Sequence, residues 1–227
     1  MHTTQLASDT FTYIPKEKLQ QNKAIYYGMV SMMDHYIGKI LDHLEENGQI
    51  DNTLIIFTTD HGAFIGHHGL VGKGVFDYED AVKIPFIASY KGKMPQGVRS
   101  QALISLVDIA PTILGMAGKK IPRCMTGIDQ TDVFMGNKKE IRDHVIVENR
   151  FQMTKFYVCT YIDKHYKLAF DMNSNEGELF DLKNDPNELI NLWNDEKYKD
   201  IKTELLLKAL QSRMKAEPVL MPRVAGA

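Results

Sequence analysis

The chain has 227 residues, enough for one large domain or for one domain with a smaller appendage. Its net charge of −2 leaves no basic surplus to neutralise phosphates, so the composition argues against a nucleic-acid-binding protein. The cysteines, Cys124 and Cys159, stand far apart and form no Cys-x-x-Cys pair, so the sequence shows neither a disulfide scaffold nor a cysteine-rich zinc site.

Signals for membrane insertion and export are also missing from this sequence. No apolar run is long enough to span a bilayer, and residues 1–18 lack the apolar core of a signal peptide. We therefore predict no contact with a membrane. A longer protein that contains this sequence could be periplasmic or cytoplasmic, because a targeting signal upstream of Met1 would not be visible here.

The first predicted elements are a helix and two strands. Residues 23–47 carry apolar side chains at steps of three and four, which predicts a helix with one face in the core; this face comprises Met29, Met33, Ile37, Ile40, Leu41 and Leu44. The continuous apolar run LIIF, residues 54–57, favours a strand buried on both faces, as in a parallel sheet covered by helices. KIPFIASY, residues 83–90, is the second candidate strand.

A helix follows these elements, and after residue 135 the predicted secondary structure changes to short strands. Residues 102–118 read as a helix with a break or fresh start near Pro111 and an end at Gly118. After residue 135, four short segments rich in Val, Tyr and Phe predict an antiparallel sheet: HVIVENR (144–150), TKFYVCTYI (154–162), HYKLAFD (165–171) and GELFDL (177–182). An amphipathic helix over residues 196–216 follows them. We therefore expect an α/β fold, with one domain over residues 1–135 and a small β-rich lobe with its helix over 136–227.

The segment TTDHGAFIGHHGLVGKG, residues 58–74, follows the strand LIIF directly. In open α/β sheets, ligands bind beyond the carboxyl ends of strands, which is where Asp60 and His61 fall. A carboxylate and an imidazole suit a divalent cation, although two ligands do not select among Ca, Mg, Mn and Zn. Lys73 lies beyond a glycine-rich turn and is suited to hold an oxyanion such as sulfate or phosphate.

Less specific interpretations of the same residues remain. Asp60 and His61 also fit an ordinary turn, and Lys73 a solvated loop. Because adjacent side chains rarely point at one position, we expect His67 and His68 to be structural, with His68 fixing the turn by hydrogen bonding. A zinc site built from three histidines, His61, His67 and His68, is the minor alternative.

Residues 58–87 closely resemble the sulfatase signature, in which a strand ends in Asp-His or Asp-Asn followed by Gly, and a Gly-x-His-Gly turn, a Lys, a Tyr-Glu and a second strand come next. Three further segments resemble that family in the same order along the chain: residues 28–53, the Asp-x-x-Pro-Thr helix in residues 105–122, and the closing segment GELFDLKNDPNELINL in residues 177–192. The resemblance implies a partial alkaline-phosphatase-like α/β/α sandwich followed by the small antiparallel lobe.

The resemblance also implies roles for individual residues. Asp60 and His61 match metal ligands, with calcium the expected ion and Mg, Mn and Zn left open. Lys73 matches the catalytic lysine that contacts the substrate's sulfate. His68 matches the turn histidine, which we place with Lys73 among the substrate-binding candidates while leaving a structural role open. The Asp-His pair also occurs in related phosphodiester and phosphonate monoester hydrolases.

The family's nucleophile motif, Cys-x-Pro/Ala-x-Arg, whose cysteine becomes formylglycine, is not in this sequence, since neither Cys124 nor Cys159 fits it. The chain therefore resembles the carboxyl-terminal part of a sulfuric ester hydrolase acting on sugar or aryl sulfates, with formylglycine expected only in the missing N-terminal part. We expect the chain alone to be inactive and to bind metal weakly. Exposed edges and apolar faces should favour self-association or docking with the missing half. The alternatives are a phosphodiester or phosphonate monoester hydrolase and a non-catalytic, truncated binding module.

Overall fold

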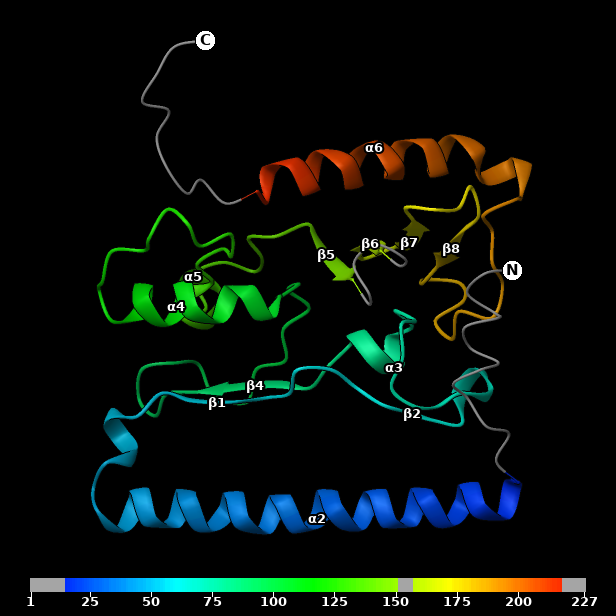
Figure 1. The fold of residues 1–227 in the computed structure, drawn as a ribbon. Helices are drawn as coiled ribbons and strands as arrows, with labels where there is room; N and C mark the ends of the chain where they lie inside the picture. Colours follow the sequence, from blue (N-terminus) through cyan, green and yellow to red (C-terminus); the bar gives the residue numbers. More distant parts are fainter. Residues whose placement is uncertain (1–14, 151–156, 218–227) are drawn as a thin grey trace, which may run out of the picture. The chain divides into compact units, whose positions relative to one another are not determined.

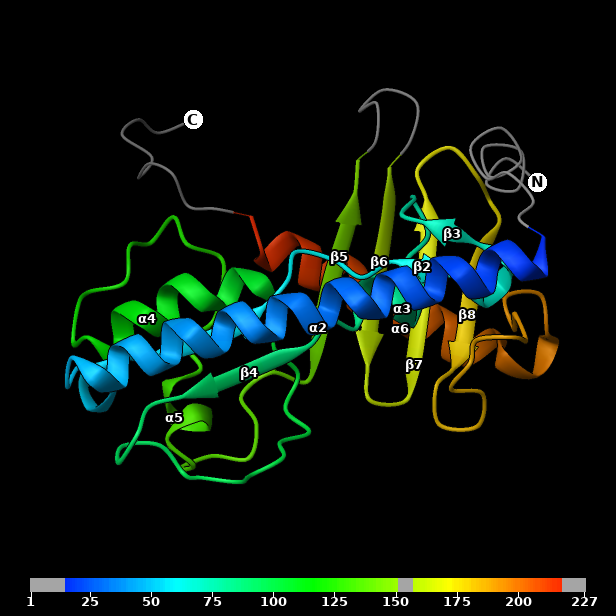
Figure 2. The same ribbon diagram turned by 90° about the horizontal axis from the view of Figure 1, so that it is seen from below.

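A computed structural model describes residues 15–150 and 157–217 (Figures 1 and 2). The chain divides into two compact units, Met1–Met94 and Pro95–Ala227, and each is considered by itself. The predicted domain division between residues 135 and 136 stays a prediction. No helix among the described residues combines the length and the apolar character that a bilayer crossing requires.

The first unit begins with one long helix, α2 (Lys16–Glu46), which follows Pro15 and is drawn in blue in Figure 1. None of its residues is buried in the described structure. Met29, Met33 and Ile40, which the sequence places on a core face, are 49%, 51% and 62% exposed. The prediction of a core face therefore holds only in part: Ile37, Leu41 and Leu44 are half-buried, and none of the six side chains is fully buried among the described residues. A 3-10 turn, η1 (Ile50–Asn52), follows the helix.

Two strands, β1 (Ile55–Thr58) and β4 (Phe86–Ser89), form the first predicted strand pair. They pair antiparallel, with Ile56 opposite Ala88, and Phe57 and Ile87 keep exposed side chains. The expected parallel sheet buried on both faces is thus not what the described residues form. The apolar run gave the strand correctly, but a continuous run does not determine the direction of its neighbour.

Between these strands lie four short elements that shape the loop. A short antiparallel hairpin has strands of two residues each, β2 (Phe64–Ile65) and β3 (Val71–Gly72). The connection between them contains the 3-10 turn η2 (His67–Gly69). The single-turn helix α3 (Glu79–Val82) follows it. Phe64 is fully buried and Leu70 is 9% exposed, so these two apolar side chains anchor the hairpin.

The second unit begins with η3 (Leu106–Asp108), which leads into α4 (Ile109–Met116), and α5 (Thr131–Phe134) follows. The fresh helix start predicted near Pro111 is confirmed: Pro111 lies in the first turn of α4, where a missing backbone N–H removes no helical bond. Asp108 is fully buried and completes a capping box with Ser105. The carboxylate is therefore a structural group at the helix start.

The predicted antiparallel lobe is confirmed as a four-stranded sheet in the order β5 (His144–Asn149), β6 (Val158–Asp163), β7 (Tyr166–Asp171) and β8 (Gly177–Asp181) (Figure 2). The start of the second predicted segment lies outside the described residues. The closing helix is present as η4 (Glu196–Tyr198) and α6 (Lys199–Lys215). The sheet and α6 share an apolar core comprising Tyr161, Leu168, Leu179, Trp193, Leu205 and Ala209.

Candidate functional site

Asp60 stands just beyond β1, and its carboxylate is held by its neighbours. The backbone N–H of His61 donates to Asp60 Oδ1 over 3.0 Å, and the Thr59 hydroxyl donates to the same oxygen over 3.2 Å. The backbone hydrogen bond, followed by that from Thr59, lowers the pKa of the Asp60 carboxyl below its ordinary value. Asp60 is therefore a carboxylate anion at neutral pH, and its oxygens are suited to act as metal ligands.

The imidazole of His61 is oriented by its own loop. Nδ1 lies 2.8 Å from the carbonyl oxygen of Gly62, a contact that only a protonated nitrogen makes favourably. In the neutral ring the lone pair then resides on Nε2. That atom lies 3.4 Å from Asp60 Oδ2 and 3.4 Å from Lys73 Nζ. The His61 imidazole thus lies within 3.4 Å of both the carboxylate and the ammonium group that the sequence singled out.

Lys73 reaches this point because of the hairpin before it. Strands β2 and β3 reverse the chain, so Lys73 returns to His61, twelve positions earlier in the sequence. Gly72 has φ +86°, a left-handed conformation that L side chains rarely adopt, and it directly precedes Lys73. The glycine-rich spacing therefore serves to bring an ammonium group to an Asp-His pair.

Gly62 fixes the Asp-His loop against α3. Its N–H donates to the carbonyl of Ala81 over 2.8 Å, and a Cβ at Gly62 would lie 1.8 Å from the carbonyl oxygen of Asp80. Only glycine allows this backbone approach. The residue after His61 is thus required by packing and positions the two candidate ligands.

The adjacent histidines His67 and His68 each contact a residue at or in α3. His68 has φ +51°, and its ring stacks on Tyr78 with centroids 3.9 Å apart and planes at 9°. The His67 ring lies 4.3 Å from the His68 ring, and His67 Nδ1 lies 2.5 Å from Asp80 Oδ2. Neighbouring side chains normally diverge, but these two rings lie together where His68 is left-handed. The structural role expected for the two histidines stays a prediction. No motif or spacing in the sequence pointed to Asp80 as a partner of His67.

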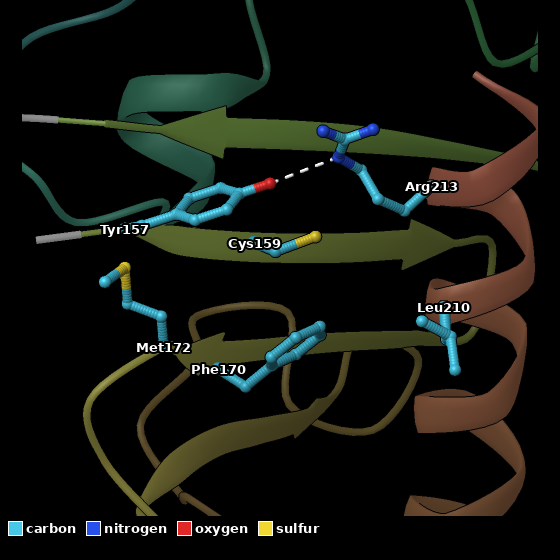
Figure 3. Close-up of a pocket in the computed structure, with 6 residues that line it drawn as sticks. All are labelled: Tyr157, Cys159, Phe170, Met172, Leu210 and Arg213. Atoms are coloured by element: carbon cyan, nitrogen blue, oxygen red, sulfur yellow. Dashed lines mark hydrogen bonds between the residues drawn. The ribbon is translucent and has the colours of Figure 1, made fainter. Parts of the chain in front are cut away.

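A hollow in the second unit is lined by Tyr157, Cys159, Phe170, Met172, Leu210 and Arg213 (Figure 3). It encloses about 110 Å³, well below the roughly 300 Å³ at which small-molecule sites begin. Arg213 and Tyr157 are hydrogen-bonded to each other, and Arg213 also pairs with Glu148. Glu148 is therefore held in a structural ion pair, and this small hollow is a weaker candidate site than the loop that carries Asp60 and His61.

Comparison with known proteins decides the family. The sulfatase family model matches residues 3–119, and the model described as N-sulphoglucosamine sulphohydrolase, C-terminal, matches residues 66–215. The chain belongs to the sulfatase family. An arylsulfatase of Clostridium perfringens is 35% identical over 207 residues, which are 88% of this chain and 42% of that protein. This sulfatase chain therefore spans about two fifths of that relative's length.

Solved structures agree with the sulfatase assignment. BT4656, in complex with its substrate D-glucosamine-2-N,6-O-disulfate, matches with a TM-score of 0.82 and 28% identity over 90% of this chain and 43% of its own. The phosphonate monoester hydrolase of Agrobacterium radiobacter matches with a TM-score of 0.83 and 27% identity over 89% of this chain and 43% of its own. The predicted α/β class of the alkaline phosphatase superfamily is thereby confirmed.

Proposed function

We propose that this chain supplies the cation-binding and sulfate-binding side of a sulfuric ester hydrolase. The observation that supports it most is the convergence of Asp60, His61 and Lys73, whose functional atoms lie 3.4 Å apart in successive pairs. Two donor atoms at that separation are compatible with one divalent cation, whose ligands lie about 2.0–2.6 Å from the metal. Family membership and the complex of a relative with a sulfated sugar support the substrate class.

Asp60 and His61 would hold the cation, which would supply stabilisation of negative charge on the reacting ester. Calcium is the proposed ion, because the carboxylate is a hard oxygen donor and both side chains are open to water that completes the coordination. Lys73 would hold a sulfate oxygen as the catalytic cation of the site. The ring of His68 stacks on Tyr78, so this side chain would support the loop and would not contact the calcium ion.

A calcium titration by calorimetry tests the cation site. We expect weak binding by the native chain and a loss of at least about tenfold in Asp60→Asn, since a neutral amide replaces the anionic ligand. Asp42→Asn, at an exposed position of α2, is the matched control and keeps native affinity. Equal affinity in Asp60→Asn and the native chain contradicts the cation site.

The ester that is cleaved needs a separate experiment on the whole gene product. A phosphonate monoester hydrolase is the second candidate function, because such enzymes match this chain as well as the sulfatases do. We expect the whole protein to hydrolyse a sulfate ester faster than the phosphonate or phosphodiester with the same leaving group, and Lys73→Ala to slow it at least about a hundredfold. A reversed preference supports the second candidate, and activity with neither ester contradicts both hydrolase functions.

A further inference from the structure

The turn between β2 and β3 gathers a second set of ligand-type side chains beside the Asp60 loop. His67, His68 and Asp80 each present a donor atom, and all three atoms lie within 4.8 Å of one another. Within the described part of the chain, no other group of three His, Cys, Asp or Glu side chains meets this condition. His61 lies outside the group, so the three-histidine arrangement considered from the sequence is not the one that the fold builds.

We propose that His67, His68 and Asp80 form a second cation site, which takes a late first-row divalent ion such as Zn²⁺. Two imidazole nitrogens and one carboxylate are a donor set that suits zinc, and three protein ligands leave a fourth position open for water. Calcium, which prefers six or more oxygen ligands, is a poor match for this set. The proposal does not depend on the function proposed for Asp60, His61 and Lys73.

The geometry needs only a modest adjustment to hold the ion. Zinc bonds of about 2.0–2.1 Å in a tetrahedron place neighbouring ligand atoms roughly 3.3 Å apart. The contact of 2.5 Å between His67 Nδ1 and Asp80 Oδ2 must lengthen as the ion replaces the shared proton. The wider separations, which are at most 4.8 Å, must shorten.

Surrounding contacts hold the three side chains in place. His68 is held by its stack on Tyr78, the residue before α3, which in turn carries Asp80. The backbone of α3 is fixed by the bond from Gly62 to Ala81. The His67 and Asp80 side chains are 36% and 25% exposed, so an ion can enter while the site stays partly shielded from water. Preorganised ligands lose little freedom when they bind a metal.

Zinc competition with a chromophoric chelator tests the site, with Co²⁺ absorption reporting the coordination number. We expect one equivalent of Zn²⁺ to bind to the native chain and the affinity to fall at least about tenfold in His67→Gln and in Asp80→Asn. His43→Gln, which removes another exposed histidine, and Asp60→Asn, which alters the proposed calcium site, are the controls and keep native zinc affinity. These controls separate failure of this proposal from failure of the calcium site.

Loss of affinity in both site variants with retention in both controls supports the proposal. It is overturned if the native chain binds no zinc, if either site variant binds as the native chain does, or if Asp60→Asn abolishes binding. If a site variant does not fold, a measurement on the native chain replaces it: zinc should protect His67 and His68, but not His43, from carbethoxylation. Equal modification of the three histidines with and without zinc also overturns the site.

Discussion

At the scale of single residues, Gly62 shows that packing requires the glycine of the Asp-His-Gly signature. We predict that Gly62→Ala destabilises the chain by about 1–3 kcal/mol, because the new Cβ meets the Asp80 carbonyl oxygen, a backbone atom that does not move cheaply. The displaced loop should also weaken calcium binding. Urea unfolding and calorimetry measure the two effects. Gly28→Ala, in α2 with nothing within 4 Å of its Cβ, should instead stabilise by about 0.5–1 kcal/mol, and similar behaviour of the two variants contradicts this account.

Asp181, at the end of β8, predicts an acid-dependent loss of stability. Burial raises the pKa of its carboxyl, but hydrogen bonds from the Asn184 side chain and from the Asn184 and Lys183 backbone outweigh burial and lower the pKa below its ordinary value of 3.8. A lowered folded-state pKa gives stability that is complete above 3.8 and is lost as pH falls through the folded value. We therefore expect the free energy of unfolding to fall less with acid in Asp181→Asn than in the native chain. Urea unfolding over roughly two pH units on either side of the ordinary pKa measures this. An unchanged slope in the variant contradicts the prediction.

At the scale of elements, the start of α4 depends on one buried ion pair. Arg142 donates to both oxygens of Asp108, from Nη2 over 2.5 Å and from Nε over 3.1 Å. Asp108 is fully buried, so Arg142→Ala leaves a carboxylate without its charge partner and should cost about 3–5 kcal/mol in unfolding free energy. Lys138→Ala, which breaks an exposed pair with Asp132, is the control and should change little. Comparable losses in the two variants contradict the prediction.

The elements also show what the sequence could predict. The four strands of the lobe follow from short Val-, Tyr- and Phe-rich segments, and the restart at Pro111 follows from proline's missing N–H. The antiparallel pairing of β1 with β4 could not be read from LIIF, because apolarity does not encode the direction of a partner. The contact of His67 with Asp80 spans thirteen positions and depends on the left-handed His68, which composition does not reveal.

At the scale of the whole molecule, α2 carries an apolar face that is exposed among the described residues. Its residues recur at steps of three and four and are 49–62% exposed; they are Ile25, Met29, Met32, Met33, Tyr36 and Ile40. Water-exposed apolar stripes of this length favour association, because burying them against another surface releases hydration water. This face is where we predict the self-association expected from the sequence to occur.

We predict that the isolated chain forms dimers or larger assemblies that dissociate on dilution, and that Met29→Glu with Ile40→Glu shifts it towards the monomer. Each substitution places a charge where a second copy of α2 would bury apolar surface. Light scattering over a range of concentrations measures the change. Gln21→Glu with Asn22→Glu adds the same charge at exposed polar positions of α2 and should leave the assembly intact. A native chain that stays monomeric at high concentration contradicts the prediction, because the stripe would then tolerate water without a partner.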